Sequence, residues 1–206
     1  MRTFHNVEQG TEEWHALRRQ YPLTASKAQA IAAQGKGLET LCYTKMSEVY
    51  SSGEVPNFSG DDTDRGNELE PQARSIYELR NGVVVEQVGF VTDDEISAVG
   101  GASPDGMVEE DGLFETKAHN DLIHFKKINE WKKTGKFKID MGYQWQMQQQ
   151  MLFTGRKWCD HAIYNPNFKD SLLVQRVERD ETMIQKLLTG LAMGEIIINE
   201  IKSNLS

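Results

Sequence analysis

The stretch ASPDGMVEEDGLFETKA, residues 102–118, has the pattern of a β-hairpin. Its halves, 105–109 and 113–117, are short strand candidates separated by an E-D-G turn signal. Side chains alternate between the two faces of a strand, so Glu115 and Lys117 should point the same way. The stretch therefore predicts a two-stranded unit that carries an acid and a lysine on one face.

Asp105 joins this pair if the two strands run antiparallel, because it then lies at the same end of the hairpin. Two carboxylates and the backbone carbonyl of Thr116 would be hard oxygen ligands of the kind that Mg²⁺ accepts, with water and a substrate phosphate as further ligands. Lys117 would orient or deprotonate an attacking water, since a partly desolvated lysine beside a metal can have a lowered pKa. The pattern thus predicts a metal site with a catalytic lysine.

A simpler interpretation stays open at this point, namely that the stretch is a charged surface hairpin. Its acid and lysine would then form an ion pair that stabilises the protein by roughly 0.2–1 kcal/mol. Leu113 and Phe114, next to the acid, favour a strand that is partly buried. A carboxylate without a partner is costly there, which argues for the metal site.

The composition is that of a folded chain with one domain, residues 1–206, because no repeat, low-complexity tract or linker divides it. An apolar content of 38% and a charged content of 26% exclude a disordered or fibrous protein. No apolar run reaches the roughly 18 residues of a membrane span, and no signal-peptide core is found, so a cytoplasmic protein is expected. Cys42 and Cys159 are too isolated for a disulfide framework or a zinc site and are expected to be buried thiols.

Helical and strand patterns alternate along the rest of the chain. Helices are expected at 12–20, 25–35, 38–51, 67–80, 120–134, 139–153 and 181–202. Further strands are expected at 82–91, 97–100, 157–166 and 171–179. Thr11, Thr24 and Asp180 are candidate N-caps, and the polar segment 51–64 is expected to be a loop, with DNA contact as one candidate role. This order predicts an α/β (α+β) fold with a central mixed β-sheet flanked by helices.

Charge is distributed unevenly along the sequence. The formal net charge is −8, which by itself disfavours a nucleic-acid partner. Between Lys126 and Lys138, however, six lysines and one acid give the window a charge of +5 and leave −13 on the rest of the chain. Such a cluster is either a solvated surface or a strip that contacts phosphates, and composition alone leaves both interpretations open.

Four motifs, in order between about residues 7 and 166, resemble those of one known family. They are W-H-x-L-R with T-A-S (Trp14–Arg18, Thr24–Ser26), R-G-x-x-x-E-x-x-A-R (Arg65–Arg74), S-P-D-G with E-T-K (Ser103–Gly106, Glu115–Lys117), and Q-x-Q with Y-N-P (Gln146–Gln148, Tyr164–Pro166). Each is weak alone, but together they are similar to the phage lambda exonuclease or viral-recombinase (YqaJ-type) alkaline exonuclease family, within the PD-(D/E)xK nuclease superfamily. The resemblance implies a restriction-endonuclease-like core.

The resemblance also implies roles at a metal centre. Asp105, Glu115 and the Thr116 carbonyl would bind Mg²⁺, with two ions expected per site and Mn²⁺ able to substitute. Lys117 would handle the nucleophilic water. Glu70 would join the acids as a second-metal or outer-shell catalytic group, although position alone favours a solvated helix acid paired with an arginine one turn later.

A second group, Arg18, Ser26, Ser103 and Gln146, matches the family positions that hold a terminal 5′-phosphate. A guanidinium can bind a phosphate through two hydrogen bonds, with hydroxyls and an amide completing the shell. Gln146 is assigned to the catalytic group as well. Alone, Arg18 could be an exposed helix charge and Gln146 part of a solvated helix face. Trp14 is expected in the core or at a cleft wall rather than as a stacking platform for bases.

The chain departs from the family pattern after the lysine, where it has Lys117-Ala118-His119 in place of a Lys-x-Pro run. The roles of His119 and His124 are therefore left open, and neither is assigned as a ligand. The DNA backbone is expected to be contacted by Lys126, Lys127, Lys132 and Lys133.

As a whole, the resemblance implies an enzyme: a Mg²⁺-dependent, processive 5′→3′ exonuclease on double-stranded DNA ends that carry a 5′-phosphate. It would release mononucleotides and leave 3′ overhangs for phage-type recombination. Relatives form homotrimeric rings and work with a single-strand annealing protein, so a phage or prophage protein of the bacterial cytoplasm is implied. The alternatives are another PD-(D/E)xK nuclease, such as an endonuclease, and a non-catalytic DNA-end-binding scaffold.

Overall fold

The structure is a computed structural model that describes residues 1–51 and 61–205, without the side chains of 61–65 and 67. Its helices are α1 (Glu12–Gln20), α2 (Ala28–Ala33), α3 (Lys36–Tyr50), α4 (Asp61–Asn81), α5 (Asp121–Thr134), α6 (Met141–Thr154) and α7 (Glu181–Leu205), with a 3-10 turn, η1 (Ala25–Lys27). Its strands are β1 (Arg2–His5), β2 (Leu23–Thr24), β3 (Val85–Glu86), β4 (Phe90–Asp93), β5 (Gly100–Gly101), β6 (Gly106–Val108), β7 (Gly112–Ala118), β8 (Trp158–Tyr164) and β9 (Leu172–Glu178). Within this described part, no helix combines the length and the apolar character needed to cross a membrane.

The main sheet of the described residues has the strand order β3-β6-β7-β8-β9. β6 and β7 form the predicted antiparallel hairpin, with Gly106 opposite Phe114. β7 pairs parallel with β8, and β8 pairs antiparallel with β9, so the sheet is mixed. Two smaller pairs, β1 with β4 and β2 with β5, complete the strands. The predicted α/β fold with a central mixed sheet is confirmed.

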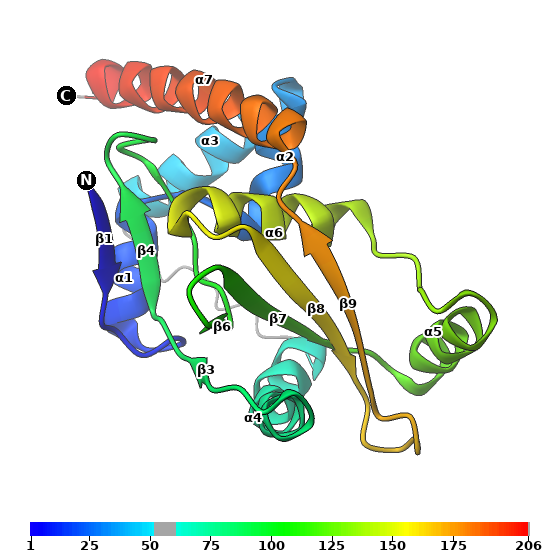
Figure 1. The fold of residues 1–206 in the computed structure, drawn as a ribbon. Helices are drawn as coiled ribbons and strands as arrows, with labels where there is room; N and C mark the ends of the chain where they lie inside the picture. Colours follow the sequence, from blue (N-terminus) through cyan, green and yellow to red (C-terminus); the bar gives the residue numbers. More distant parts are fainter. Residues whose placement is uncertain (52–60, 206) are drawn as a thin grey trace.

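Helices cover both faces of this sheet (Figure 1). On one face Tyr77 of α4 packs in an apolar cluster with Phe114 of β7. On the other face Met151 of α6 packs in a cluster with Leu113 of β7. α7 lies outside α6 and forms a further apolar cluster with α2 and α3. Because alternate residues of β7 face α4 and α6, the charged residues that follow Leu113 on its face lie beneath α6.

The three predicted N-caps differ in outcome. Thr11 caps α1, where its hydroxyl accepts from the Trp14 amide at 3.3 Å. Asp180 caps α7, accepting from the Thr182 amide at 2.8 Å. Thr24 is not a side-chain cap: it ends strand β2, the 3-10 turn η1 follows, and α2 begins four residues after Thr24. Its hydroxyl instead contacts two other side chains, which are described below.

Two other segments also differ from expectation. The predicted strand 82–91 is split into β3, in the main sheet, and β4, which pairs with β1. Gly89 lies at the break, where a Cβ atom would be 1.9 Å from the carbonyl oxygen of Val7, so only glycine permits this close approach. Of the predicted loop 51–64, residues 52–60 lie outside the described part, and α4 already begins at Asp61.

Candidate active site

The β6–β7 hairpin places Asp105 beside the acid–lysine strand, as its sequence pattern predicts. Asp105 lies just before β6, and its Oδ2 accepts a hydrogen bond from the Thr116 amide at 2.7 Å. This bond crosses the hairpin from the end of one strand to the middle of the next. The Asp105 carboxylate is thereby held against β7, next to the backbone of the predicted carbonyl ligand.

Glu115 is fully buried beneath α6, and three side chains satisfy its carboxylate. Gln146 donates from Nε2 to Oε1 at 2.6 Å, and Gln150, one helical turn later, donates to Oε2 at 2.7 Å. Lys117 donates from Nζ to Oε1 on the same strand face. The Lys117 ammonium also lies 5.4 Å from the ring centroid of Tyr143 on α6. A buried carboxylate with these partners excludes the surface-hairpin interpretation.

The charges of this group shift one another's pKa. Burial, and after it the negative charge of Glu115, raises the pKa of Asp105 well above its ordinary value. Burial alone would lower the pKa of Lys117, but the charges of Glu115 and Asp105 together raise it above its ordinary value. The lowered lysine pKa is expected beside a bound metal ion and stays a prediction. Lys117 is protonated and acts as a hydrogen-bond donor.

The oxygen donors of Asp105, Glu115 and Thr116 determine which metal ion the site could hold. Among the described residues, no three His, Cys, Asp or Glu side chains lie close enough together to hold a metal by themselves. Asp105 and Glu115 form a carboxylate pair with a neighbouring carbonyl, and burial followed by the charge of Glu115 raises the pKa of Asp105. Mg²⁺ is often held by one or two carboxylates while keeping several waters. The pair therefore fits a hard divalent ion that also binds water and substrate.

Glu70 of α4 lies near this group but has another partner. Its Oε1 accepts from Arg74 Nη1 at 3.4 Å, the i,i+4 pair that the sequence allowed. Burial raises the pKa of Glu70; the charge of Arg74 opposes this shift, and that of Glu115 adds to it. The charge of the buried Glu115 thus contributes to the raised pKa of Glu70. Its role as a second-metal or outer-shell group stays a prediction.

The predicted phosphate ligands gather around Trp14. The indole Nε1 donates to the Ser103 hydroxyl at 3.0 Å, and the Arg18 guanidinium carbon lies 4.2 Å from the indole ring centroid. Arg18 also donates from Nη2 to the Thr24 hydroxyl at 3.4 Å, which lies 3.3 Å from the Ser26 hydroxyl. Burial lowers the pKa of Arg18 to about 10, so the guanidinium stays charged at neutral pH.

Gln146 is the predicted phosphate ligand that the structure does not bring to this cluster. Its amide donates to Glu115, and among the described residues no hydrogen bond joins it to Arg18, Ser26 or Ser103. It lies beside Glu115 instead, and its second assignment, to the catalytic group, stays a prediction. The group around Glu115 and the cluster around Trp14 are instead linked by Gln150, whose Nε2 also donates to the Ser103 carbonyl at 3.3 Å.

Sequence reasoning missed the assignment of three site residues: Gln150, Thr24 and Trp14. Gln150 is not among the predicted site residues, although its spacing of four from Gln146 places both amides on one helix face. Thr24 is predicted as an N-cap. Trp14, which is expected in the core or at a cleft wall, is also the surface on which Arg18 rests and a donor to Ser103. A tryptophan four positions before an arginine on one helix is the signal that could have indicated this stacking.

The lysines of the basic window are not equivalent. Lys127 is largely buried and donates to the Lys138 carbonyl, and Lys132 pairs with Asp170 at 3.0 Å. Lys126 and Lys133 are exposed, and no ion pair of the described residues includes them. His124 in the same helix is fully buried, with Nε2 3.0 Å from the Asp170 carbonyl, so its role is structural.

Comparison with known proteins identifies the family of the chain. The family model of the YqaJ-like viral recombinase domain matches residues 13–157. The chain is similar to an alkaline exonuclease (LHK-Exo) from Laribacter hongkongensis, at 33% identity, 95% coverage of this chain, 98% of that chain and a TM-score of 0.76. The structure of that enzyme in complex with dAMP matches at the same identity and coverage, with a TM-score of 0.74. A phage related exonuclease from Haemophilus somnus 129PT shares the fold at 15% identity, over 89% of this chain and 96% of that chain, with a TM-score of 0.65. No curated protein matches the chain.

Fold and site together define an α/β protein whose central hairpin carries a PD…ExK arrangement of two acids and a lysine. The chain belongs to the YqaJ-like viral recombinase family, and the family resemblance predicted from its motifs is confirmed.

Proposed function

We propose that the chain is a Mg²⁺-dependent 5′→3′ exonuclease that digests double-stranded DNA from 5′-phosphorylated ends. The observation that carries the proposal is the buried Glu115, held by Lys117 and two amides beside Asp105. A carboxylate pair with a protonated lysine suits hydrolysis of a phosphodiester, whose reaction adds negative charge to the phosphate oxygens.

The site residues divide the chemistry between them. Asp105, Glu115 and the Thr116 carbonyl would hold magnesium, which when bound supplies Lewis-acid stabilisation of the phosphate charge; Mn²⁺ can serve in the same way. Lys117 holds the attacking water in line with the bond to be broken. As the bond between water oxygen and phosphorus forms, the bond from phosphorus to the 3′-oxygen breaks; the water loses a proton to solvent, and the leaving 3′-oxygen takes one up from solvent. The products are a 5′-mononucleotide and a new 5′-phosphate on the shortened strand.

The cluster around Trp14 would set the direction of digestion. Arg18, with the hydroxyls of Ser26 and Ser103, binds the terminal 5′-phosphate, and so only one end of a strand can lie beside the metal-binding acids. Each cut produces a 5′-phosphate that can enter the same pocket. This cycle is compatible with processive digestion that leaves a 3′ overhang.

The relatives support this substrate class. The Laribacter relative is described as an alkaline exonuclease and has been crystallised with dAMP, a deoxynucleoside monophosphate. At 33% identity over 95% of the chain, the same type of product is the simplest inference for this protein.

Family resemblance also suggests the partners. We infer a homotrimeric ring around DNA, a second ion at the side of Glu70, a single-strand annealing protein as partner, and action in the cytoplasm of a phage- or prophage-bearing bacterium as one domain, 1–206. The surplus of acids outside the 126–138 window is compatible with a ring whose positive charge faces its channel.

Digestion of linear duplex DNA labelled separately at each 5′ and 3′ end, with Mg²⁺ or with EDTA, tests the proposal. Early release of the 5′ label as mononucleotide, only with Mg²⁺ and faster from phosphorylated ends, is expected. Incision of covalently closed circular DNA would instead favour an endonuclease, and binding without any digestion would favour a scaffold. Equal rates from 5′-hydroxyl and 5′-phosphate ends would contradict the phosphate pocket.

A further inference from the structure

Three consecutive glutamines of α6, Gln148, Gln149 and Gln150, are buried, with at most 1% of each exposed. The sequence alternative of a solvated helix face is therefore wrong for this part of α6. Burying a side-chain amide is costly unless it finds hydrogen-bond partners. Each of the three donates from Nε2 to a partner in a different part of the fold.

Gln149 joins the two backbone segments that carry the phosphate-binding hydroxyls. Its Nε2 donates to the Leu23 carbonyl at 2.8 Å and to the Gly101 carbonyl at 3.2 Å. These carbonyls belong to β2 and β5, which pair in parallel. Ser26 follows β2 by two residues, and Ser103 follows β5 by two residues. One amide therefore forms hydrogen bonds to both strands that lead to the proposed pocket.

The backbone of β5 can approach α6 because it consists of glycine. A Cβ atom on Gly100 would lie 2.8 Å from the Phe153 ring, and one on Gly101 would lie 2.4 Å from the Phe90 ring. Both distances are too short for a side chain. Gly100 therefore permits the close approach of β5 to Phe153 of α6, where Gln149 reaches the Gly101 carbonyl, and Gly101 permits the approach of β5 to Phe90 of β4.

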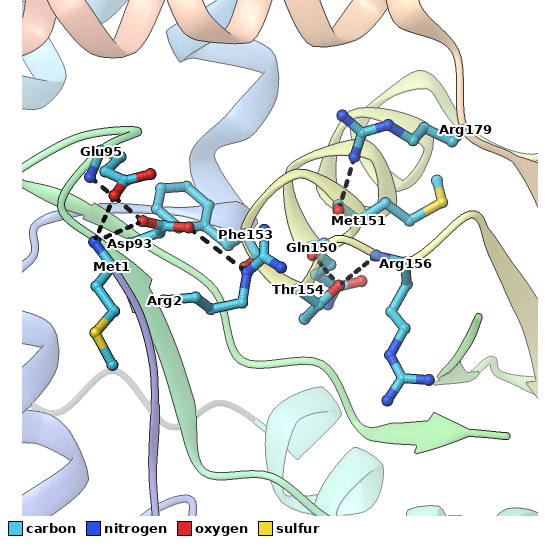
Figure 2. A network of polar contacts seen from close by, with 10 residues as sticks. All are labelled: Met1, Arg2, Asp93, Glu95, Gln150, Met151, Phe153, Thr154, Arg156 and Arg179. Atoms are coloured by element: carbon cyan, nitrogen blue, oxygen red, sulfur yellow. Dashed lines mark hydrogen bonds and ion pairs between the residues drawn. The ribbon is translucent and has the colours of Figure 1, made fainter. Parts of the chain in front are cut away.

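The position of α6 along its axis is fixed at its C-terminal end (Figure 2). Arg2 of β1 donates from Nε to the Phe153 carbonyl at 2.5 Å, and Arg179, after β9, donates from Nη1 to the Met151 carbonyl at 2.8 Å. Carbonyls of a last helical turn lack partners within the helix, and cations there are favourable. Figure 2 shows the two arginines reaching the helix from different directions.

The same helix also holds the catalytic acid. Gln146 and Gln150 donate to the two oxygens of Glu115, and Gln150 shares its amide with the Ser103 carbonyl. One helix thus donates hydrogen bonds both to the metal-binding carboxylate and to the backbone beside the proposed phosphate pocket.

We propose that Gln149 is a positioning residue that sets the distance between the terminal-phosphate pocket and Glu115, and with it the preference for 5′-phosphorylated ends. This inference rests on the proposed function. Gln149 contacts neither pocket hydroxyls nor the carboxylate; it acts through the Leu23 and Gly101 carbonyls. A misplacement of about 1 Å at a reacting centre can cost about 100-fold in rate, so loosening these segments should be measurable.

The test compares Gln149→Met with Gln148→Met. Methionine keeps the length of the side chain but removes the amide. Gln148 is the matched control because it is equally buried on the same helix and donates to the Glu178 carbonyl at 2.8 Å, away from both halves of the site. The readouts are binding of duplexes with 5′-phosphate or 5′-hydroxyl ends in EDTA, by fluorescence anisotropy, and kcat/KM on the same ends with Mg²⁺.

For Gln149→Met, two ratios of phosphate end to hydroxyl end are expected to fall about tenfold or more: the ratio of binding constants and the ratio of kcat/KM values. Gln148→Met is expected to keep both wild-type ratios, although it unfolds at a lower temperature. A wild-type ratio in Gln149→Met, or equal losses in both variants, would overturn the inference. If Gln149→Met does not fold, Gln149→Asn, whose shorter amide cannot reach both carbonyls, decides in the same way.

The proposed function and this inference can fail separately. Wild-type protein that binds phosphorylated ends preferentially but digests nothing would refute the activity, and the binding ratio would still decide the role of Gln149. Wild-type protein without any phosphate preference would refute the pocket and the inference together.

Discussion

The guanidinium of Arg18 lies over the indole of Trp14, with its central carbon 4.2 Å from the ring centroid. The same indole donates to the Ser103 hydroxyl, which comes from a segment 89 positions away in the chain. Stacking restricts the arginine side chain before any ligand binds, so less conformational entropy is lost when it binds a phosphate. Trp14 is thereby the residue that joins Arg18 to Ser103, two of the proposed phosphate ligands.

Replacing Arg18 should weaken the recognition of phosphorylated ends. In Arg18→Ala, kcat/KM on 5′-phosphate ends should fall about 10- to 100-fold, the equivalent of roughly 1.5–3 kcal/mol for hydrogen bonds to a charged group. Digestion from 5′-hydroxyl ends should change little. Arg19→Ala is the matched control, because Arg19 is an exposed neighbour on the same helix. Equal effects of the two substitutions would contradict the pocket.

Removing the lysine of the hairpin should abolish hydrolysis but not the recognition of ends. Lys117→Ala removes the donor next to Glu115, so digestion with Mg²⁺ should fall by about 100-fold or more. Binding of phosphorylated duplex in EDTA should remain within a few-fold of wild type, because Lys117 lies outside the Trp14 cluster. Wild-type digestion rates in this variant would refute the active-site assignment.

A separate polar cluster should control stability. Asp160 of β8 accepts from the Tyr77 hydroxyl of α4 at 2.7 Å and from Arg176 of β9 at 2.8 and 3.0 Å. Asp160→Ala leaves a buried hydroxyl without its partner, and the free energy of unfolding should fall by about 2–4 kcal/mol in urea titrations. Lys157→Ala, which breaks the exposed pair with Asp111, should leave the urea midpoint almost unchanged. A similar midpoint shift in both variants would contradict this difference.

His161 should make the fold sensitive to acid. Burial lowers the pKa of His161 to about 3, so the folded protein keeps it neutral while the unfolded chain binds a proton near pH 6.5. The unfolded state then holds more protons below pH 6.5, and stability is lost as the pH falls, by at most about 1.4 kcal/mol per pH unit for one group.

His161→Leu should therefore reduce the drop in melting temperature between pH 7 and pH 5. Some of the drop should remain, because burial also lowers the pKa of His119 and His124. An unchanged pH dependence would show that His161 is protonated without cost in the folded protein.

The exposed lysines should contribute to the salt dependence of DNA binding. Lys126→Gln and Lys133→Gln should each reduce the slope of log K against log salt by about 1, if each contacts one phosphate. Lys132→Gln should have a smaller effect, since Lys132 already pairs with Asp170. Anisotropy titrations at several salt concentrations measure these slopes. Unchanged slopes in the first two variants would assign the window to solvated surface.

Local patterns predicted the parts of the fold whose causes are local. The hairpin followed from strand alternation on both sides of a turn, and the caps at Thr11 and Asp180 followed from residues that satisfy nearby amides. Thr24 has the same residue type but no side-chain cap, because its hydroxyl is engaged with Arg18 and Ser26. The split of strand 82–91 depends on the approach of Val7, which sequence patterns do not indicate.

By itself, the sequence determined that Asp105, Glu115 and Lys117 meet on one hairpin, because alternation and pairing within 17 residues suffice to bring them together. Only the tertiary structure decided which side chains of α6 form hydrogen bonds to Glu115 and to the neighbouring strands. The amide of Gln149 finds carbonyls 126 and 48 positions away, and that of Gln150 finds Glu115 35 positions away. Such partners depend on how α6 packs between the sheet and α7, and a row of glutamines has the same sequence pattern whether it faces water or a buried site.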